Sequence, residues 1–194
     1  MAELRIGVLA VQGNFREHAA VLRRLGAEPV EVRLPEQLDG LDGLIVPGGE
    51  STAMTRLMHL YGLDEAVRRF EPPIFGTCAG MILLDRDHLA LADISTRRNA
   101  FGRQQASFET DLTLPTLFGR NGEPLRAVFI RAPWIEEAGE GVEVLAEVEG
   151  HPVLAREGRI LVAAFHPELT DDTRLHARFL ETVKAAREGV RVGA

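Results

Sequence analysis

The only cysteine of the chain, Cys78, lies within residues 76–80, GTCAG, directly after an apolar run. Gly76 and Gly80 permit close backbone approach and a sharp turn from a strand into a helix. Such a turn would hold the thiol at the surface, at the amino end of the helix, where free N–H groups favour a thiolate. The N–H of Ala79 could then stabilise an oxyanion. The alternative is a small buried hydrophobic residue, because free cysteines are among the most buried residues.

A thiolate that attacks an amide needs a general base that later protonates the departing amine. Of the six histidines, His166 fits best, because it follows an apolar run and precedes Glu168 by two residues. Pro167 favours an extended backbone, which would put the two side chains on the same side. The alternative is a solvated turn that ends a strand. No catalytic role is expected for the remaining histidines, which lie in helical or loop contexts: His18, His59, His88, His151 and His176.

The segment VPGGEST, residues 46–52, ends another apolar run. Its consecutive glycines let a peptide rotate before the chain enters a helix, so the segment could supply a second donor to an oxyanion. One alternative is an ordinary loop with Ser51 as N-cap. A phosphate site is less well supported, because the Gly-Lys-Ser/Thr ending is absent and Glu50 would repel phosphate. No cysteine pair or H-x-x-x-H motif is present, so no metal site is predicted.

The first half of the chain alternates short apolar runs with helical periods, which is typical of strand–helix units in a parallel sheet. Asn14 is expected to cap the first helix, with Glu17 three residues on, and Gly26 is expected to end it. The expected strands are residues 4–11, 28–34, 43–47 and 73–76, and the expected helices are 15–25, 51–61, 63–70 and one that starts after Cys78.

Beyond residue 90 the runs are short and broken by Gly or Pro, which predicts hairpins and an antiparallel edge. The spacing of apolar residues over 170–187 predicts a final helix with Leu175, Phe179 and Val183 on one face. No repeat, low-complexity tract or flexible linker is present, so a single domain is predicted over residues 1–194. The strand-like runs are residues 106–114, 126–134, 142–150, 151–158 and 159–169.

The chain has 194 residues, is 45% hydrophobic and carries a formal net charge of −7. This length can bury a core, and the acidic balance argues against nucleic acid as a partner. A single cysteine excludes an intramolecular disulfide and favours a reducing compartment. The N-terminal MAELRIGVLAVQG has no basic leader, and its apolar stretch is too short to span a bilayer. We expect a soluble cytoplasmic protein with no membrane interaction.

Six motifs in chain order resemble those of the class I (triad) glutamine amidotransferases: AVQGNFREH, VPGGEST, GTCAGM, RRNAFGRQQASFE, FIRAPWI and FHPEL. Within that class the chain is similar to the glutaminase subunits of pyridoxal 5′-phosphate synthase, the PdxT type, from residue 5 to about residue 185. The resemblance implies an α/β fold, a flavodoxin-like three-layer sandwich. Its central sheet would be mostly parallel, with added antiparallel strands in the C-terminal half.

The resemblance implies that Cys78 is the nucleophile and that His166 and Glu168 form the relay pair. It also implies that Gly49, Glu50, Ser51, Arg98, Ile130 and Arg131 bind L-glutamine, and that Gly49, Ala79 and Gln12 form the oxyanion site. The physical argument agrees for the charged residues, because the α-carboxylate of glutamine requires a guanidinium and its α-ammonium requires acceptors. A solvated face is the alternative for the arginines. Residues 85–96 depart from the family pattern by being shorter than expected, which affects a loop and not the triad.

The implied reaction is hydrolysis of L-glutamine to L-glutamate and ammonia through a γ-glutamyl thioester, with no metal or organic cofactor. The implied partner is the synthase (lyase) subunit of a hetero-oligomer whose product is pyridoxal 5′-phosphate (vitamin B6). The peptide between Gly48 and Gly49 is expected to be misoriented in the free protein and to flip when this partner docks. Two other functions stay open. One is a related enzyme, such as a γ-glutamyl hydrolase or a glutaminase for another synthase, and the other is a binding or redox-sensing protein that uses Cys78.

Overall fold

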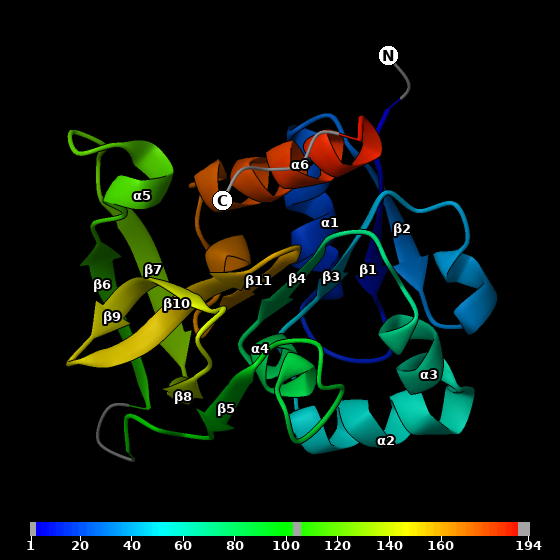
Figure 1. Ribbon diagram of the computed structural model, residues 1–194, viewed down its shortest axis with the longest axis horizontal. Coiled ribbons are helices and arrows are strands. Elements are labelled where there is room, and N and C mark those ends of the chain that lie inside the picture. Colours follow the sequence, from blue (N-terminus) through cyan, green and yellow to red (C-terminus); the bar gives the residue numbers. More distant parts are fainter. Residues whose placement is uncertain (1–2, 103–105, 190–194) are drawn as a thin grey trace.

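The computed structural model describes residues 3–102 and 106–189. At its centre is a seven-stranded sheet with the order β2-β1-β3-β4-β11-β10-β9 (Figure 1). The first five strands in this order run parallel to one another. The last two, β10 and β9, pair antiparallel with their neighbours and extend the sheet. The strand bounds are β1 (Arg5–Leu9), β2 (Glu28–Val32), β3 (Gly43–Val46), β4 (Ile74–Thr77), β9 (Glu143–Val148), β10 (His151–Glu157) and β11 (Ile160–Ala163).

Continuous apolar runs explain the parallel part of the sheet. β3 and β4 are buried along their whole length, as expected for strands that helices cover on both faces. The strand order reverses between β1 and β3, as it does in flavodoxin-like folds. The predicted α/β fold, with a mostly parallel sheet and antiparallel strands in the C-terminal half, is therefore confirmed.

Helices cover both faces of the sheet (Figure 1). Phe179 of the last helix packs on Phe75 of β4, with ring centroids 5.6 Å apart. That helix begins at Arg174, later than the sequence predicts, because the chain bends at residues 170–171, where the Thr170 hydroxyl accepts from the Asp172 N–H at 3.3 Å. One face carries α1 (Phe15–Arg24) and α6 (Arg174–Arg187), and the other carries α2 (Ser51–Tyr61), α3 (Leu63–Arg68) and α4 (Ala79–Leu84).

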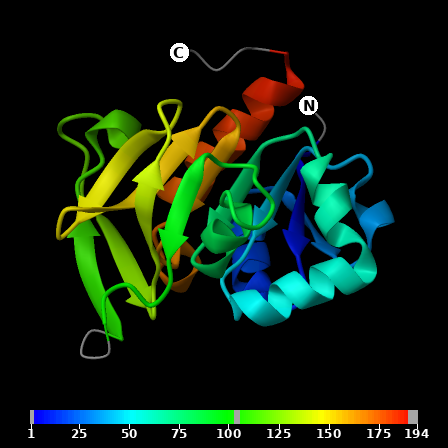
Figure 2. The ribbon, with the colours of Figure 1, turned by 60° about the horizontal axis from the view of Figure 1, so that its bottom comes forward.

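The antiparallel strands gather at one end of the molecule, away from α2 and α3 (Figure 2). The run expected as one strand over 126–134 is divided in two, because Arg131 has a φ of 43° and turns the chain. Three further elements are not predicted by the sequence pattern: β5, the short helix α5 (Pro115–Phe118) and the 3-10 helix η1 (Pro35–Leu38). The strand pairs are β5 (Ile94–Arg97) with β8 (Trp134–Ala138), and β6 (Ser107–Leu112) with β7 (Leu125–Ile130).

The segment expected to be short, residues 85–96, forms turns up to residue 93 and then the first part of β5. Asp85 is buried, and its carboxylate accepts hydrogen bonds from the Asp87 N–H and the Thr96 hydroxyl. The same carboxylate lies 2.7 Å from Nδ1 of His88. One buried side chain therefore organises the segment.

Gly80 lets α4 lie directly on the end of β3. A Cβ on Gly80 would lie 1.9 Å from the carbonyl oxygen of Val46, and a Cβ on Gly76 would lie 2.8 Å from the backbone of Gly80. These close approaches confirm the tight turn predicted for the two glycines around Cys78.

We expect Gly80→Ala to lower the free energy of unfolding by about 3 kcal/mol, because the added methyl group meets backbone that cannot move aside. Denaturant titration measures the change. Gly141→Ala is the matched control, since its Cβ would meet only the flexible end of Glu157 at 3.3 Å. Equal stability of the two variants would contradict the packing of α4 described above.

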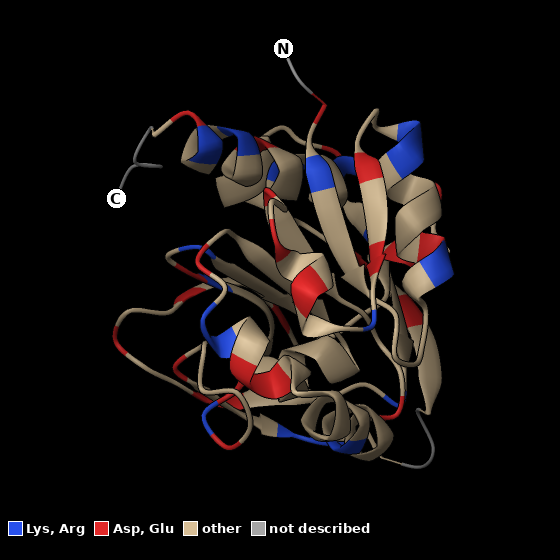
Figure 3. Ribbon diagram, turned by 90° about the vertical axis from the view of Figure 1, so that its right-hand side faces the viewer, with Lys and Arg blue, Asp and Glu red and all other residues tan. Residues whose placement is uncertain are grey.

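Charged residues of both signs are interspersed along the helices and loops of the side shown in Figure 3. The chain has 29 acidic and 22 basic residues. On this side the acidic residues do not form one continuous block. Within the described part of the chain, no helix is long and apolar enough to cross a membrane.

Candidate active site

The loops that follow four strands meet at the carboxyl edge of the sheet. Residues 10–14 follow β1, residues 47–50 follow β3, Cys78 follows β4, and His166 lies just beyond β11. In open α/β sheets, ligands bind at this edge beside the point where the strand order reverses. The topology thus brings together motifs that are far apart in the sequence.

Cys78 joins β4 to α4 in a strained turn. Its φ of 50° and ψ of −109° are rarely adopted by a residue with a side chain. Its N–H donates to the Ala163 carbonyl at 2.8 Å, and its own carbonyl accepts from the N–H of Met81 at 3.0 Å. A strained strand–turn–helix of this kind is typical of a displayed nucleophile.

The thiol of Cys78 is less exposed than the sequence predicts. Cys78 is only 7% exposed, and its Sγ lies 4.0 Å from the carbonyl oxygen of Ile130. The prediction of a thiol held at the surface is therefore wrong, because the end of β7 partly covers the turn. The residue nevertheless lines a cavity of about 430 Å³.

This cavity brings together nearly all of the residues that the sequence assigns to the site. Its volume suits a small polar ligand. Glu168 lies behind His166 and is not part of the lining. Among the described residues, no group of three or more His, Cys, Asp or Glu side chains could hold a metal ion. The predicted residues that line the cavity are Gln12, Gly49, Glu50, Ser51, Cys78, Ala79, Arg98, Ile130, Arg131 and His166, and those not predicted are Gly13, Asn14, Ile82, Asn99 and Pro133.

His166 and Glu168 form a buried pair, with 2.7 Å between Nδ1 and Oε1. The extended backbone expected between them is wrong, because the chain forms a 3-10 helix, η2 (Pro167–Leu169), whose turn brings the carboxylate back to the ring. Phe165, fully buried against Phe129 at a centroid distance of 5.5 Å, anchors the backbone before His166. The predicted contact therefore exists, but through a different local structure.

The electrostatics of this pair depend on its partners. Burial alone would lower the pKa of His166, but hydrogen bonds with Cys78 and Glu168 and the carboxylate charge raise it to about 10. Burial alone would raise the pKa of Glu168, but His18 and the hydrogen bonds from His166 and Asn14 hold it at about 2. The site thus holds a charged imidazole between the sulfur and an ionised carboxylate.

Asn14 belongs to the site, which the sequence does not predict. It occupies the N-cap position of α1 as expected, but its side chain makes no capping hydrogen bond, so the expected capping box with Glu17 is wrong. Instead, Nδ2 donates to Oε1 of Glu168 at 3.1 Å and lies 3.4 Å from Nδ1 of His166. An asparagine just before a helix is expected as an N-cap, so the sequence gives no sign that its side chain contacts Glu168.

Glu50, and not Ser51, caps α2. The carboxylate of Glu50 accepts from the N–H groups of Ala53 and Thr52 at 2.7 and 3.0 Å, and these hydrogen bonds lower the pKa of Glu50. The alternative with Ser51 as the N-cap is wrong, because Ser51 is the buried first residue of the helix. Oε1 of Gln12 accepts from the Glu50 N–H at 2.8 Å, which joins the loops after β1 and β3.

Arg98, Ile130 and Arg131 reach the cavity from the antiparallel strands. Arg98 donates to the Thr52 hydroxyl at 3.1 Å, so its charge lies near the carboxylate that caps α2. Ile130 is 37% exposed at the end of β7, and Arg131 turns the chain with its N–H donating to the Ala106 carbonyl at 2.6 Å. The amino end of α2 and the turn between β7 and β8 therefore border the cavity on two sides.

Gly48 lets the backbone after β3 pass close to the side chains of His166 and Cys78. A Cβ on Gly48 would lie 2.5 Å from Cε1 of His166 and 3.2 Å from Cβ of Cys78, so only glycine fits. Its carbonyl accepts from the Asn14 N–H at 3.0 Å. This hydrogen bond fixes the peptide between Gly48 and Gly49, and a flip of that peptide would break it at a cost of about 1 kcal/mol.

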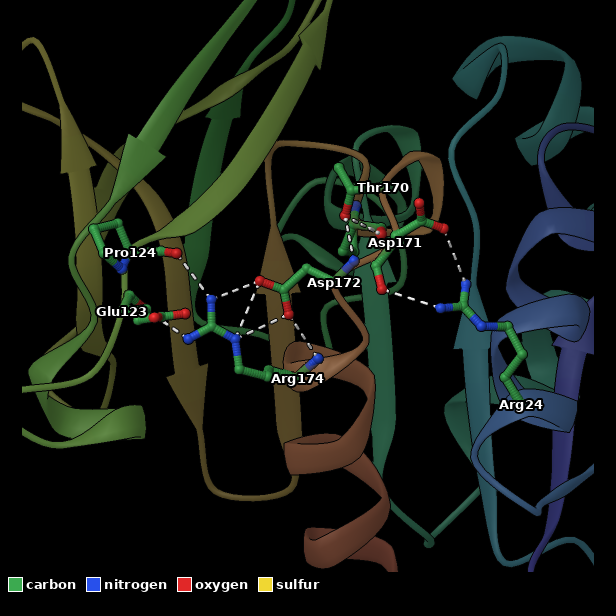
Figure 4. Close-up of polar contacts among 8 residues, drawn as sticks. Arg24, Glu123, Pro124, Thr170, Asp171, Asp172 and Arg174 are labelled. Atoms are coloured by element: carbon green, nitrogen blue, oxygen red, sulfur yellow. Dashed lines mark hydrogen bonds and ion pairs between the residues drawn. The ribbon is translucent and has the colours of Figure 1, made fainter.

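The segment that follows η2 is held on two sides (Figure 4). Arg174 donates to the backbone carbonyls of residues 123 and 124 at 2.7 and 2.8 Å and to the carboxylate of Asp172. Arg24 of α1 reaches Asp171, but that pair is solvent-exposed and contributes little. The Arg174 contacts tie the start of α6 to the loop before β7, which limits the movement of η2.

We expect the stability of the protein to be greatest near pH 6.5 and to fall on both sides. Burial lowers the pKa of His18 and, to about 3, of His176, and the pKa of Glu168 is also low. The unfolded chain therefore takes up more protons than the folded chain at the two histidines below about pH 6.5, and at Glu168 below about pH 4.5, at about 1.4 kcal/mol per pH unit per group. His166 acts oppositely, because stability from its raised pKa is lost as the pH rises through about 10. Melting temperatures across this range measure the profile, and undiminished stability in acid would contradict it.

The fold, with its mostly parallel sheet and added antiparallel strands, is that of the class I glutamine amidotransferases. A solved structure described as a glutamine amidotransferase superposes with a TM-score of 0.85 at 48% identity, covering 92% of this chain and 98% of its own. A putative GMP synthase component from Thermoplasma acidophilum shares the fold at a TM-score of 0.77 and 20% identity, covering 97% of this chain and 98% of its own.

The chain belongs to the SNO glutamine amidotransferase family, whose pattern matches residues 8–185. It is 54% identical over 196 residues to the pyridoxal 5′-phosphate synthase subunit PdxT of Pelotomaculum thermopropionicum, covering 96% of this chain and 97% of that protein. It is 51% identical to the PdxT subunit of Thermotoga neapolitana, covering 93% of this chain and all of that protein. The family resemblance and the prediction of a glutamine amidotransferase are confirmed.

Proposed function

We propose that this chain hydrolyses L-glutamine to L-glutamate and ammonia, with Cys78 as nucleophile, and supplies the ammonia to a pyridoxal 5′-phosphate synthase subunit. The observation that carries the proposal is the strained turn at Cys78, which faces the His166–Glu168 pair at the edge of a cavity. This arrangement supports the proposal, because the mechanism requires a nucleophile, a proton carrier and a carboxylate that orients the proton carrier.

In the first step, the Cys78 thiolate attacks the side-chain amide carbon of glutamine. The C=O electron pair moves to oxygen, and the N–H of Ala79 and a backbone amide at Gly49 stabilise the resulting oxyanion. Gln12 holds the Gly49–Glu50 segment in place through its hydrogen bond with the Glu50 N–H.

In the second step, the C–N bond breaks as the His166 imidazolium gives its proton to the leaving amine, so that ammonia departs and a γ-glutamyl thioester remains. Neutral His166 then takes a proton from water, and the hydroxide attacks the thioester carbon. The C–S bond breaks, glutamate leaves, and the thiolate–imidazolium pair is restored. Glu168 keeps the imidazole oriented throughout and stabilises its charged form.

The cavity carries charges that suit the ends of a free amino acid. Arg98 and Arg131 line it and are assigned to the α-carboxylate. The Glu50 carboxylate, fixed by its cap bonds, is assigned to the α-ammonium together with backbone oxygens. Ser51 and Ile130 complete the glutamine site. No metal or organic cofactor is required for this chemistry.

The synthase partner is assigned because relatives of about 50% identity over nearly their full length are named as subunits of pyridoxal 5′-phosphate synthase. Ammonia released into water would be protonated and lost, so the partner is expected to dock over the site in a hetero-oligomer. We assign the complex to the cytoplasm. The Gly48–Gly49 peptide, held by Asn14, is the element that docking would reorient.

The test is glutamate production from L-glutamine by the purified chain, alone and with the synthase subunit, together with the transfer of ¹⁵N from glutamine amide into pyridoxal 5′-phosphate. We expect hydrolysis that the partner increases, and label in the product. Absence of hydrolysis in both samples would overturn the proposed activity. Hydrolysis without label in the product would overturn the proposed partner, and equal rates with and without the partner would overturn the gating.

A further inference from the structure

Two buried histidines lie directly behind the site and have no part in the mechanism above. His18 of α1 and His176 of α6 are fully buried, and 2.9 Å separates Nδ1 of His18 from Nε2 of His176. The other nitrogen of His18, Nε2, lies 3.1 Å from the hydroxyl of Thr77 and 3.4 Å from Oε2 of Glu168. Polar groups at this depth are costly unless they are paired, so the arrangement requires an explanation.

The hydrogen-bond geometry determines where the protons lie. Burial lowers the pKa of His18 and of His176, so both rings are neutral and each carries one N–H. Because the Glu168 carboxylate can only accept, Nε2 of His18 carries the proton that faces it. Nδ1 of His18 is then an acceptor, and His176 donates to it from Nε2. Nδ1 of His176 has no hydrogen-bond partner within the described part of the chain. In this tautomer it is an unprotonated nitrogen, so no buried N–H donor is left unpaired on this ring.

Glu168 needs a donor on this side. Its Oε1 already accepts from His166 and Asn14. Its Oε2 is buried and has no hydrogen-bond partner among the residues that the structure describes, and Nε2 of His18 faces it at 3.4 Å. A carboxylate held at one oxygen only could rotate about its last bond and lose its alignment with the imidazole.

We propose that His18 is a positioning residue of the glutaminase, whose Nε2–H holds Oε2 of Glu168 and so keeps Oε1 directed at Nδ1 of His166. His176 keeps His18 in the tautomer that can donate. The contact with Thr77, which immediately precedes Cys78, ties the same imidazole to the turn that carries the nucleophile. The inference rests on the proposed function, because it assigns Glu168 to the catalytic group.

Removal of His18 has a consequence for pH dependence. The titratable groups around Glu168 are His166, His18 and His176, with Cys78 beyond His166 and Glu17 acting on His18 from α1. Without a donor at Oε2, the buried carboxylate is less stable in its charged form, so its pKa rises. The acid limb of the glutaminase profile then moves to higher pH.

The kinetic test compares His18→Phe, which keeps a ring but no donor, with His18→Gln, whose amide can place a donor near the Nε2 position. Both are assayed in complex with the synthase subunit, with the exposed His59→Phe as control. We expect His18→Phe to lower kcat about 10-fold to 100-fold with little change in KM and to shift the acid limb upward, and His18→Gln to recover most of the rate. Equal losses in both variants with an unshifted profile would show a merely structural role and overturn the proposal.

A second measurement needs no variant. Side-chain ¹⁵N NMR of the folded wild-type chain reports the tautomer of each histidine, and we expect neutral Nε2–H forms for His18 and His176. A charged His18, or an Nδ1–H form, would overturn the proposal. If His18→Phe does not fold, His176→Phe, which removes only the donor to His18, takes its place in the kinetic test. An inactive wild-type enzyme would count against the proposed function, whereas an active one with an unshifted His18→Phe profile would count against His18 alone.

Discussion

Cys78→Ala is expected to lower glutaminase activity by about 10⁴-fold or more, because no other group in the cavity can form the thioester. The comparison is kcat of the purified complex with glutamine, together with intact-protein mass after rapid quenching. Wild-type protein should show a γ-glutamyl adduct when hydrolysis is slowed, and the variant should show none.

The strain at Cys78 provides a control that separates activity from folding. The backbone at this position has a φ of 50°, which glycine adopts at little cost. Cys78→Gly should therefore be as inactive as Cys78→Ala but more stable than it, by about 1 kcal/mol. If Cys78→Gly were the less stable variant, the strained turn would not describe the protein in solution.

His166→Asn is expected to lower kcat by about 10³-fold to 10⁴-fold, because the variant can neither protonate the departing ammonia nor activate water. The asparagine amide can occupy the position of Nδ1 and still donate to Glu168, so its stability should stay near that of the wild type. Steady-state kinetics and thermal unfolding measure the two effects.

His166→Ala is the matched comparison. It removes the same base but also takes the donor away from Oε1 of Glu168, which is buried. We expect it to be as inactive as His166→Asn and less stable by about 1–3 kcal/mol, because a buried carboxylate loses a hydrogen bond. Full activity in either variant would require a different base, and equal stability would mean that the hydrogen bond with Glu168 contributes little.

The parallel half of the fold was predictable because its signals are local. β3 and β4 are buried strands that read as continuous apolar runs, and Gly76 and Gly80 indicated the turn between β4 and α4. β5 and α5 were not predictable, because their four-residue segments carry no periodic pattern. The division of the run over 126–134 depends on the positive φ of Arg131, which a sequence does not reveal.

The residues that line the candidate site were more predictable than the contacts that support them. Cys78 and His166 are recognisable by residue type and motif, whereas Asn14 reads as a helix cap and His18 as one residue on the buried face of a helix. Only the tertiary packing of α1 against η2 brings these side chains to Glu168. The pairing of His166 with Glu168 was predicted on an extended geometry that the structure replaces with a 3-10 turn.

The most direct test of the account is labelling with a glutamine-derived electrophile, followed by mass spectrometry of the digested protein. We predict one adduct per chain, located on Cys78, that forms faster with the synthase subunit bound, is prevented by excess L-glutamine and is lost in His166→Asn. Modification at another residue, or labelling of Cys78 that L-glutamine does not slow, would contradict the assignment of this cavity as a glutaminase site.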